Sequence, residues 1–122
     1  MQSKIGGNAV REDIKINDRA LALEEQIIEK LEKVYDTDVE LDVYNLGLIY
    51  EIHLDEAGLC TIVMTFTDTA CSCAESLPIE VVAGLKQIDG IKDVKVEVTW
   101  SPAWKITRIS RYGRIALGLP PR

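Results

Sequence analysis

Met64–Pro78, with the sequence MTFTDTACSCAESLP, is the stretch that decides how this chain can fold. It continues an apolar run, crosses a short polar segment and enters a helical pattern, which predicts a strand, a loop carrying two thiols and a helix. A thiol at the N-terminal end of a helix feels positive partial charge, which favours the reactive thiolate. Cys71 is therefore a candidate reactive residue, although Cys, Ser and Thr also occur in such loops simply because they cap helices and tolerate burial.

The segment before this stretch predicts a β-hairpin. Residues 44–54 alternate between apolar and polar, and Asp55-Glu56-Ala57-Gly58 supplies a turn. Residues 59–67 are expected to return as an antiparallel strand. Gly47 within the first strand indicates a bulge or the close approach of another group. The alternate residues expected on one face of the first strand are Leu46, Leu48, Tyr50, Ile52 and Leu54.

Helical patterns flank the hairpin. A helix of about five turns is expected from Asn17 or Asp18 onward. After the thiol loop, Pro78 fits the first turn of a second helix that ends at Asp89-Gly90. Thr107 is expected to cap a last helix over residues 108–117.

A third strand lies between the last two helices, parallel to the second strand. Its inward residues are expected to be Val94, Val96, Val98 and Trp100. The order α-β-β-α-β-α predicts an α/β fold of the two-layer α+β type, with a small three-stranded mixed sheet covered by helices.

The length of 122 residues fits one domain. Residues 1–16 show no sustained period and are expected to form a mobile extension, with the single domain over 17–122. A net charge of -6 argues against a nucleic-acid binder. The longest apolar runs are far shorter than the roughly 20 residues that cross a bilayer. Because the first residues contain no apolar signal region, a cytoplasmic location is expected.

The three cysteines favour free thiols or metal ligands over a disulfide framework. Cys60 lies within the second strand, where a small buried side chain is expected. A thiol enzyme needs a base, and the single histidine, His53, is predicted near the hairpin turn, far from Cys71. The sequence therefore favours a protein that is not an enzyme.

Residues 36–43 hold four acidic side chains in alternation and are expected to form a loop. The Gly and the closing Glu of a calcium loop are missing. Two interpretations remain for Asp36 and Asp38, a solvated acidic turn or oxygen ligands of a metal.

Five motifs along the chain together carry a family resemblance. They are Asp36-Thr37-Asp38, Tyr44–Tyr50 (YNLGLIY), Met64–Thr67 (MTFT) followed by Cys71, Trp100–Trp104 (WSPAW), and Ser110-Arg111 leading to Ala116-Leu117-Gly118. With these motifs the chain resembles the SufT-like and PaaD-like family of iron-sulfur cluster assembly factors over roughly residues 20–119. The resemblance implies a fold related to small iron-sulfur carrier domains, a frequent dimer, and a role in maturing iron-sulfur proteins.

By position, the family's reactive cysteine falls on Cys71, and its Asp-Pro-Glu motif falls on residues 36–38. Thr37 and Ser72 stand where the family commonly has proline, which removes two backbone constraints from these loops. Cys73 is an added thiol that either chelates a metal together with Cys71 or resolves an oxidised Cys71.

The leading hypothesis is a factor that binds iron or an iron-sulfur cluster transiently and transfers it to client apoproteins. Cys71 and Cys73 would be the thiolate ligands, with Asp36 and Asp38 near them. A cluster needs four ligands, so a homodimer or an external thiol would complete the set. A single iron or zinc ion would fit the same residues.

The alternative is a metal-free adaptor that docks client proteins onto the iron-sulfur assembly machinery. The segment from Ser101 onward has no acidic residue, and its basic residues recur at intervals of three. This pattern indicates a docking stripe, a solvated helix face, or ion pairs to Glu24 and Glu29. The basic residues are Lys105, Arg108, Arg111 and Arg114.

Overall fold

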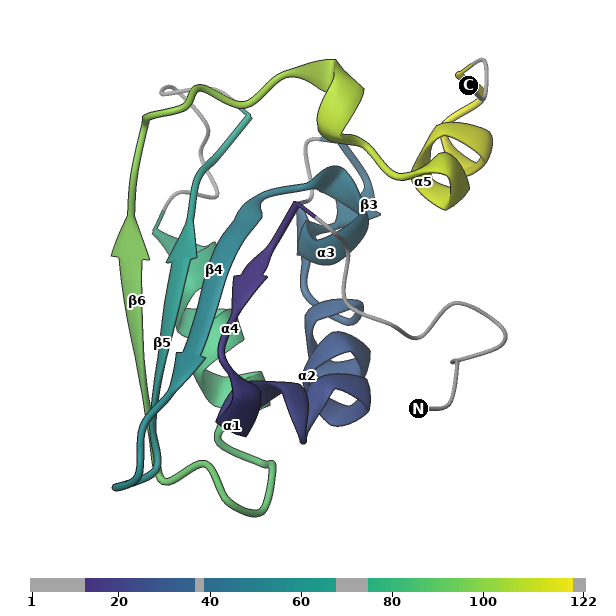
Figure 1. Ribbon diagram of the computed structural model, residues 1–122. Helices are drawn as coiled ribbons and strands as arrows, with labels where there is room; N and C mark the ends of the chain where they lie inside the picture. Colours follow the sequence, from purple (N-terminus) through teal and green to yellow (C-terminus); the bar gives the residue numbers. More distant parts are fainter. Residues whose placement is uncertain (1–12, 37–38, 68–74, 120–122) are drawn as a thin grey trace.

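The structure is a computed structural model and describes residues 13–36, 39–67 and 75–119. Helices and one mixed sheet form two layers, as Figure 1 shows. The predicted α+β class is therefore confirmed. No helix among the described residues is long and apolar enough to span a membrane.

The main sheet has four strands in the order β1-β4-β5-β6. The predicted hairpin is β4 (Ile49–Leu54) and β5 (Leu59–Met64), which pair antiparallel, and β6 (Asp93–Val98) lies parallel to β5 as predicted. The fourth strand is β1 (Lys15–Ile16), which pairs parallel with β4, so the prediction of a three-stranded sheet is wrong. The prediction of an extension over 1–16 is wrong for these two residues, because a two-residue strand is too short to show a period.

The helices pack against one face of this sheet. Alternate residues of β5 (Cys60, Ile62 and Met64) are fully buried, as are Ile27 of α2 (Glu24–Leu31) and Val81 of α4 (Ser76–Leu85). Because α2 and α4 also contact each other, one continuous apolar layer lies between helices and sheet.

The predicted five-turn helix is divided into α1 (Asp18–Leu21) and α2. Asn17 caps α1 as predicted, since its side chain accepts a hydrogen bond from Ala20 N at 3.2 Å. The same carboxamide donates to Leu54 O at 2.9 Å and accepts from Leu54 N at 3.0 Å. These bonds fix α1 to the end of β4, whereas α2 packs on α4, so the chain changes direction at Ala22 and Leu23.

The first strand of the hairpin is shorter than predicted. Residues 43–46 form the short helix α3 (Val43–Leu46), which ends at Gly47 in the left-handed conformation with φ 81°. The pairing is irregular between Ile49 and Glu51. At this point Ile49 is buried and Tyr50 only partly so, the reverse of the prediction, whereas Ile52 and Leu54 are buried as predicted.

The predicted loop at residues 36–43 contains a two-stranded antiparallel sheet, β2 (Tyr35–Asp36) with β3 (Leu41–Asp42). On β6, Val98 is 43% exposed, and Trp100 beyond it is 46% exposed. The prediction that both face inward is wrong, because β6 is an outer strand of the sheet and its end is less covered.

The C-terminal segment is a 3-10 turn, η2 (Ile106–Arg108), followed by α5 (Arg111–Ala116). Ser110 caps α5 by accepting a hydrogen bond from Gly113 N at 3.0 Å. Thr107 lies within η2, so the predicted cap is wrong by three residues. The predicted helix is interrupted between η2 and α5. Here Ser110 N donates to Asn45 O at 2.8 Å, and this bond ties the residue to α3.

Candidate functional site

The structure describes the residues at both ends of the thiol loop, but the two thiols lie outside the described residues. β5 ends at Met64 and α4 begins at Ser76, two residues before the expected Pro78. Cys71, Cys73 and Asp38 fall in the ranges that the structure does not describe. Cys71 precedes the first residue of α4 by five positions, so the effect of this helix on its pKa stays a prediction.

Three consecutive backbone carbonyls, those of residues 46–48, accept hydrogen bonds from segments near the start of this loop. Leu46 O accepts from Trp104 Nε1 at 2.7 Å, and Gly47 O accepts from Arg108 Nε at 2.7 Å. Leu48 O accepts from Thr65 N at 2.9 Å, just beyond β5. Helix ends leave carbonyls without helical partners, and here other segments of the chain satisfy them. Three of the five motifs, at 44–50, 64–67 and 100–104, therefore meet at one end of the sheet.

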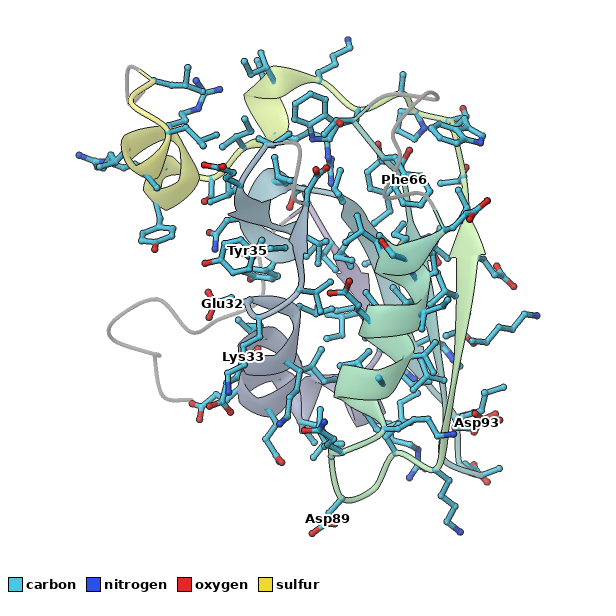
Figure 2. The ribbon with its side chains drawn as sticks, turned by 180° about the vertical axis from the view of Figure 1, so that it is seen from behind. Glu32, Lys33, Tyr35, Phe66, Asp89 and Asp93 are labelled. Carbon is cyan, nitrogen blue, oxygen red and sulfur yellow. The ribbon has the colours of Figure 1, made fainter. Side chains whose placement is uncertain are left out.

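An aromatic pair lies where the chain enters the loop. Thr99 N donates to Met64 O at 2.9 Å, which continues the pairing of β5 and β6 past their last residues. Phe66 and Trp100 lie with ring centroids 5.6 Å apart. Phe66 is buried and Trp100 is half exposed. Figure 2 places Phe66 at the opposite end of the molecule from Asp89 and Asp93.

Thr65, part of the Met64–Thr67 motif, is a buried polar residue for which no separate role was predicted. Its side chain is fully buried, and its hydroxyl has no hydrogen-bond partner among the described residues. Buried hydroxyls nearly always have a partner. Because Thr65 is three residues from the first undescribed loop residue, it joins the candidate site as a polar group facing no described acceptor or donor. The signal in the sequence was a polar residue between Met64 and Phe66 in an apolar run.

Asp36 is fully buried in β2, so the interpretation as a solvated acidic turn is wrong for this residue. Its Oδ1 accepts a hydrogen bond from Val39 N at 3.3 Å. Charged residues are rarely buried without a structural or chemical reason. A role of Asp36 as a metal ligand remains a prediction, because the residues it would act with lie outside the described part of the chain.

Asp42, by contrast, has a structural role. Its carboxylate accepts from Asn45 N at 2.9 Å and from the Asn45 side chain at 3.0 Å, which caps α3. Burial raises the pKa of Asp42, and the hydrogen bonds from Asn45 partly offset this effect. Ser110 Oγ donates to Asn45 Oδ1 at 2.6 Å, so the cap also holds the C-terminal segment.

Arg108 belongs to the framework of the site and not to a solvated stripe. Its guanidinium lies 4.3 Å from the centroid of the Tyr50 ring and 3.5 Å from Asp13 Oδ2. Burial raises the pKa of Tyr50, while the Arg108 charge lowers it. The Tyr50 hydroxyl donates to Pro102 O at 2.6 Å. These contacts fix the segment after β6 against β4.

Two other residues with possible roles in thiol chemistry, Cys60 and His53, lie too far from the thiol loop to belong to the site. Cys60 is fully buried in β5, as predicted, and burial raises the pKa of its thiol to about 11. His53 is exposed and pairs across the hairpin with Thr61. Thr61 lies six residues before Thr67, which is about 20 Å along a strand. His53 is therefore far from the start of the thiol loop, as predicted.

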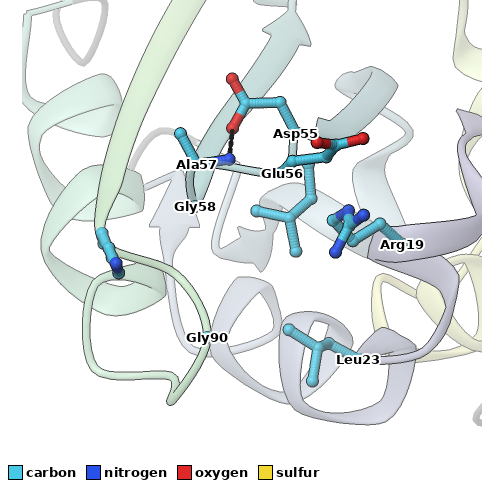
Figure 3. Close-up of a pocket in the computed structure, with 9 residues that line it drawn as sticks. Arg19, Leu23, Asp55, Glu56, Ala57, Gly58 and Gly90 are labelled. Carbon is cyan, nitrogen blue, oxygen red and sulfur yellow. Dashed lines mark hydrogen bonds between the residues drawn. The ribbon is translucent and has the colours of Figure 1, made fainter.

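A shallow hollow of about 230 Å³ lies between α1 and the hairpin turn (Figure 3). Arg19, Leu23 and Lys92 line it together with the turn, and Asp55 Oδ1 accepts from Ala57 N at 2.9 Å. The described residues that line the hollow include no thiol, no histidine and no unpaired buried polar group that could act chemically. Within the described ranges, no three His, Cys, Asp or Glu side chains are grouped so that they could hold a metal ion.

The chain matches the model of a known family, described as "Iron-sulfur cluster assembly protein", over residues 24–98. This match spans both ends of the thiol loop and more than half of the chain. The chain belongs to the iron-sulfur cluster assembly protein family.

Curated members of the family agree with the SufT-like resemblance. The chain is 41% identical over 98 residues to the "Fe-S protein maturation auxiliary factor YitW" of Bacillus subtilis, covering 80% of this chain and 96% of that protein. It is 38% identical over 86 residues to the "Fe-S protein maturation auxiliary factor SufT" of Staphylococcus aureus, covering 70% of this chain and 98% of that protein. Both names describe auxiliary factors and not enzymes.

The fold of this assembly protein also has a solved counterpart. The crystal structure of a "Domain of Unknown Function DUF59" from Bacillus anthracis is similar, with a TM-score of 0.75 and 34% identity. The similarity covers 81% of this chain and 94% of the other.

Proposed function

We propose that this protein is an auxiliary factor in the maturation of iron-sulfur proteins, and that the thiolate of Cys71 carries iron or a cluster to client apoproteins. The relatives named above as maturation factors support the role. The observation that carries the proposal is the meeting of three motif segments around the β5 end of the thiol loop.

The chemistry of the loop suits a cargo that must leave again. Thiolates are the preferred ligands of iron-sulfur clusters, which need four of them. Cys71 and Cys73 supply two per chain, and Cys60 is buried with a raised pKa. The other ligands would come from a second copy of the chain, an external thiol or the client itself. An incomplete protein ligand set keeps the cargo exchangeable. Free thiols of this kind require a reducing compartment, which supports a cytoplasmic location.

The two acidic candidates have the same role in the proposal. Asp36 is a buried carboxylate and would act as an oxygen ligand or orient a thiol ligand. Asp38 is proposed for the same role from its position two residues later.

Anaerobic reconstitution with iron and sulfide tests the proposal. Visible absorption and bound iron per chain are compared for the wild type, Cys71→Ser and Cys73→Ser. Cys60→Ala is the matched control, because it removes a thiol that lies in the core. We expect a chromophore that Cys60→Ala keeps and Cys71→Ser loses. If Cys73→Ser keeps the chromophore, Cys71 is the principal ligand. If Cys73→Ser loses it, the two thiols bind the metal as a chelating pair.

A metal-free adaptor is the second candidate function, and one observation favours it. The C-terminal segment has no acidic residue and holds several exposed side chains. If the folded wild type binds no iron under reconstitution, the carrier role fails and the adaptor role is the better account.

A further inference from the structure

Charge is unevenly distributed along the chain. All 20 acidic residues precede Ser101, and the last 22 residues contain five basic residues and none that is acidic. The overall net charge of -6 therefore hides a basic C-terminal segment attached to an acidic body.

The structure divides this segment into an inward and an outward set. Trp104, Arg108 and Ser110 bind the backbone or side chains of residues 45–49, and Gly113 is buried close to Leu41. The outward set, here named the C-terminal strip, comprises Lys105, Ile106, Arg111, Tyr112 and Ile115. The predicted stripe of four basic residues is thus reduced to Lys105 and Arg111, since Arg108 points into the framework and the half-buried Arg114 donates to Ile106 O at 3.2 Å.

The apolar members of the C-terminal strip are unusually open. Ile106 is 53% exposed, Tyr112 64% and Ile115 59%. Tyr112 and Ile115 are three residues apart in α5 and so lie on the same side of that helix. Several large apolar side chains exposed in one short segment are typical of an interaction surface.

The basic members of the C-terminal strip are available for a partner. Lys105 and Arg111 are exposed, and no ion pair involves either of them within the described part of the chain. The strip also has a fixed position, since the inward set ties η2 and α5 to α3. Figure 1 shows η2 and α5 as successive turns at the edge of the molecule. A surface that is already ordered loses little entropy when it binds.

We propose that the C-terminal strip docks an acidic segment of another protein whose apolar side chains cover Ile106, Tyr112 and Ile115. This inference rests on the proposed function, because the partner would be a component of the same maturation process. Because the strip is basic, charge complementarity favours a partner segment with a negative charge. An anionic membrane is disfavoured, because the acidic body of the chain would be repelled from it and α5 has only six residues.

Binding of a synthetic peptide tests the inference. The probe is a short fluorescent peptide that alternates glutamate with leucine and phenylalanine, and its binding to the full chain is followed by anisotropy. Two control peptides replace either every glutamate by lysine or every apolar residue by serine. We expect binding of the first peptide only, weakened by added salt because exposed charges are screened.

Variants locate the binding surface. Arg111→Glu and the double variant Tyr112→Ser/Ile115→Ser should each weaken binding about fivefold or more. Lys33→Glu is the matched control, because it makes the same charge change at an exposed side chain of the acidic body. Equal effects of Arg111→Glu and Lys33→Glu would overturn the inference, since binding would then follow net charge alone.

Three further measurements complete the test. Concentration-dependent dimerisation that Arg111→Glu abolishes would overturn the inference in favour of self-association. Binding to vesicles of anionic lipid, with no binding of the peptide, would overturn it in favour of a membrane. Iron reconstitution separates this inference from the proposed function. The strip variants should keep the chromophore, and Cys71→Ser should keep peptide binding.

Discussion

Replacing Gly47 by alanine should destabilise the protein more than the same replacement at Gly58 or Gly118. A Cβ at Gly47 would lie 2.5 Å from Arg108 O and 2.7 Å from Arg108 Cβ. These atoms belong to a turn that is tied to α3 on both sides, so they cannot simply move away.

The expected loss has two parts. The left-handed conformation at φ 81° costs an alanine about 1–2 kcal/mol relative to glycine. Displacing the Arg108 backbone also strains the charged hydrogen bond from Arg108 Nε to Gly47 O, which is worth about 1.5–3 kcal/mol. The total of about 2.5–5 kcal/mol is a large share of a typical domain stability of about 5–15 kcal/mol.

Urea unfolding followed by circular dichroism measures this loss, and two other glycines with positive φ are controls. At Gly58 the nearest atom to an added Cβ is Lys92 Cγ, part of a flexible side chain, and at Gly118 no atom lies within 4 Å. Gly58→Ala and Gly118→Ala should therefore cost about 1–2 kcal/mol or less. If Gly47→Ala loses no more stability than Gly58→Ala, the Arg108 turn is not rigid and the reasoning is refuted.

Three further predictions concern separate parts of the molecule. The Cys60 thiol, whose pKa burial raises to about 11, should react with a thiol reagent only after unfolding, whereas reaction in the folded state would contradict its burial. Asn17→Ala should cost about 2–4 kcal/mol in urea unfolding, because it removes the cap of α1 and both bonds to Leu54, and Asn17→Asp should lose less since it keeps the acceptor. Burial and the Asp42 charge raise the pKa of Glu32 from 4.5, so its ionised form opposes folding above that raised pKa. Glu32→Gln should therefore gain less than about 1 kcal/mol at neutral pH, and the gain should vanish in acid as Glu32 protonates; an equal gain at both pH values would contradict this.

The parts of the fold that local sequence determines were predictable. The hairpin, the parallel strand after the thiol loop and the helix between them follow from alternation, turn residues and caps, all of which act over a few positions. The parts that failed depend on distant contacts. The division of α1 from α2 depends on Asn17 binding Leu54, and β1 exists only through its pairing with β4.

The sequence predicted which motifs contribute to the site, but not which of their residues contact one another. Gly47 was expected to mark a bulge or a close approach, and the close approach is that of Arg108, while the irregular pairing lies at Tyr50. Arg108 could not be separated from Arg111 by spacing alone, because contacts with Tyr50 and Gly47, which are distant in the sequence, turn it inward. The burial of Asp36 and Thr65 likewise comes from packing between distant segments.

The left-handed glycine explains why the three motifs can share one short turn. In a continuing helix the carbonyls of Leu46, Gly47 and Leu48 would all point along the axis toward later amides. Ending α3 at a residue with φ 81° turns the chain, so these carbonyls are free to bind Trp104, Arg108 and Thr65, which come from different parts of the chain. The start of the thiol loop, at Thr65 just after β5, and the η2 end of the C-terminal strip are therefore both held by this turn. A change at this turn should alter both surfaces together, whereas changes at Cys71 or Arg111 should alter one surface each.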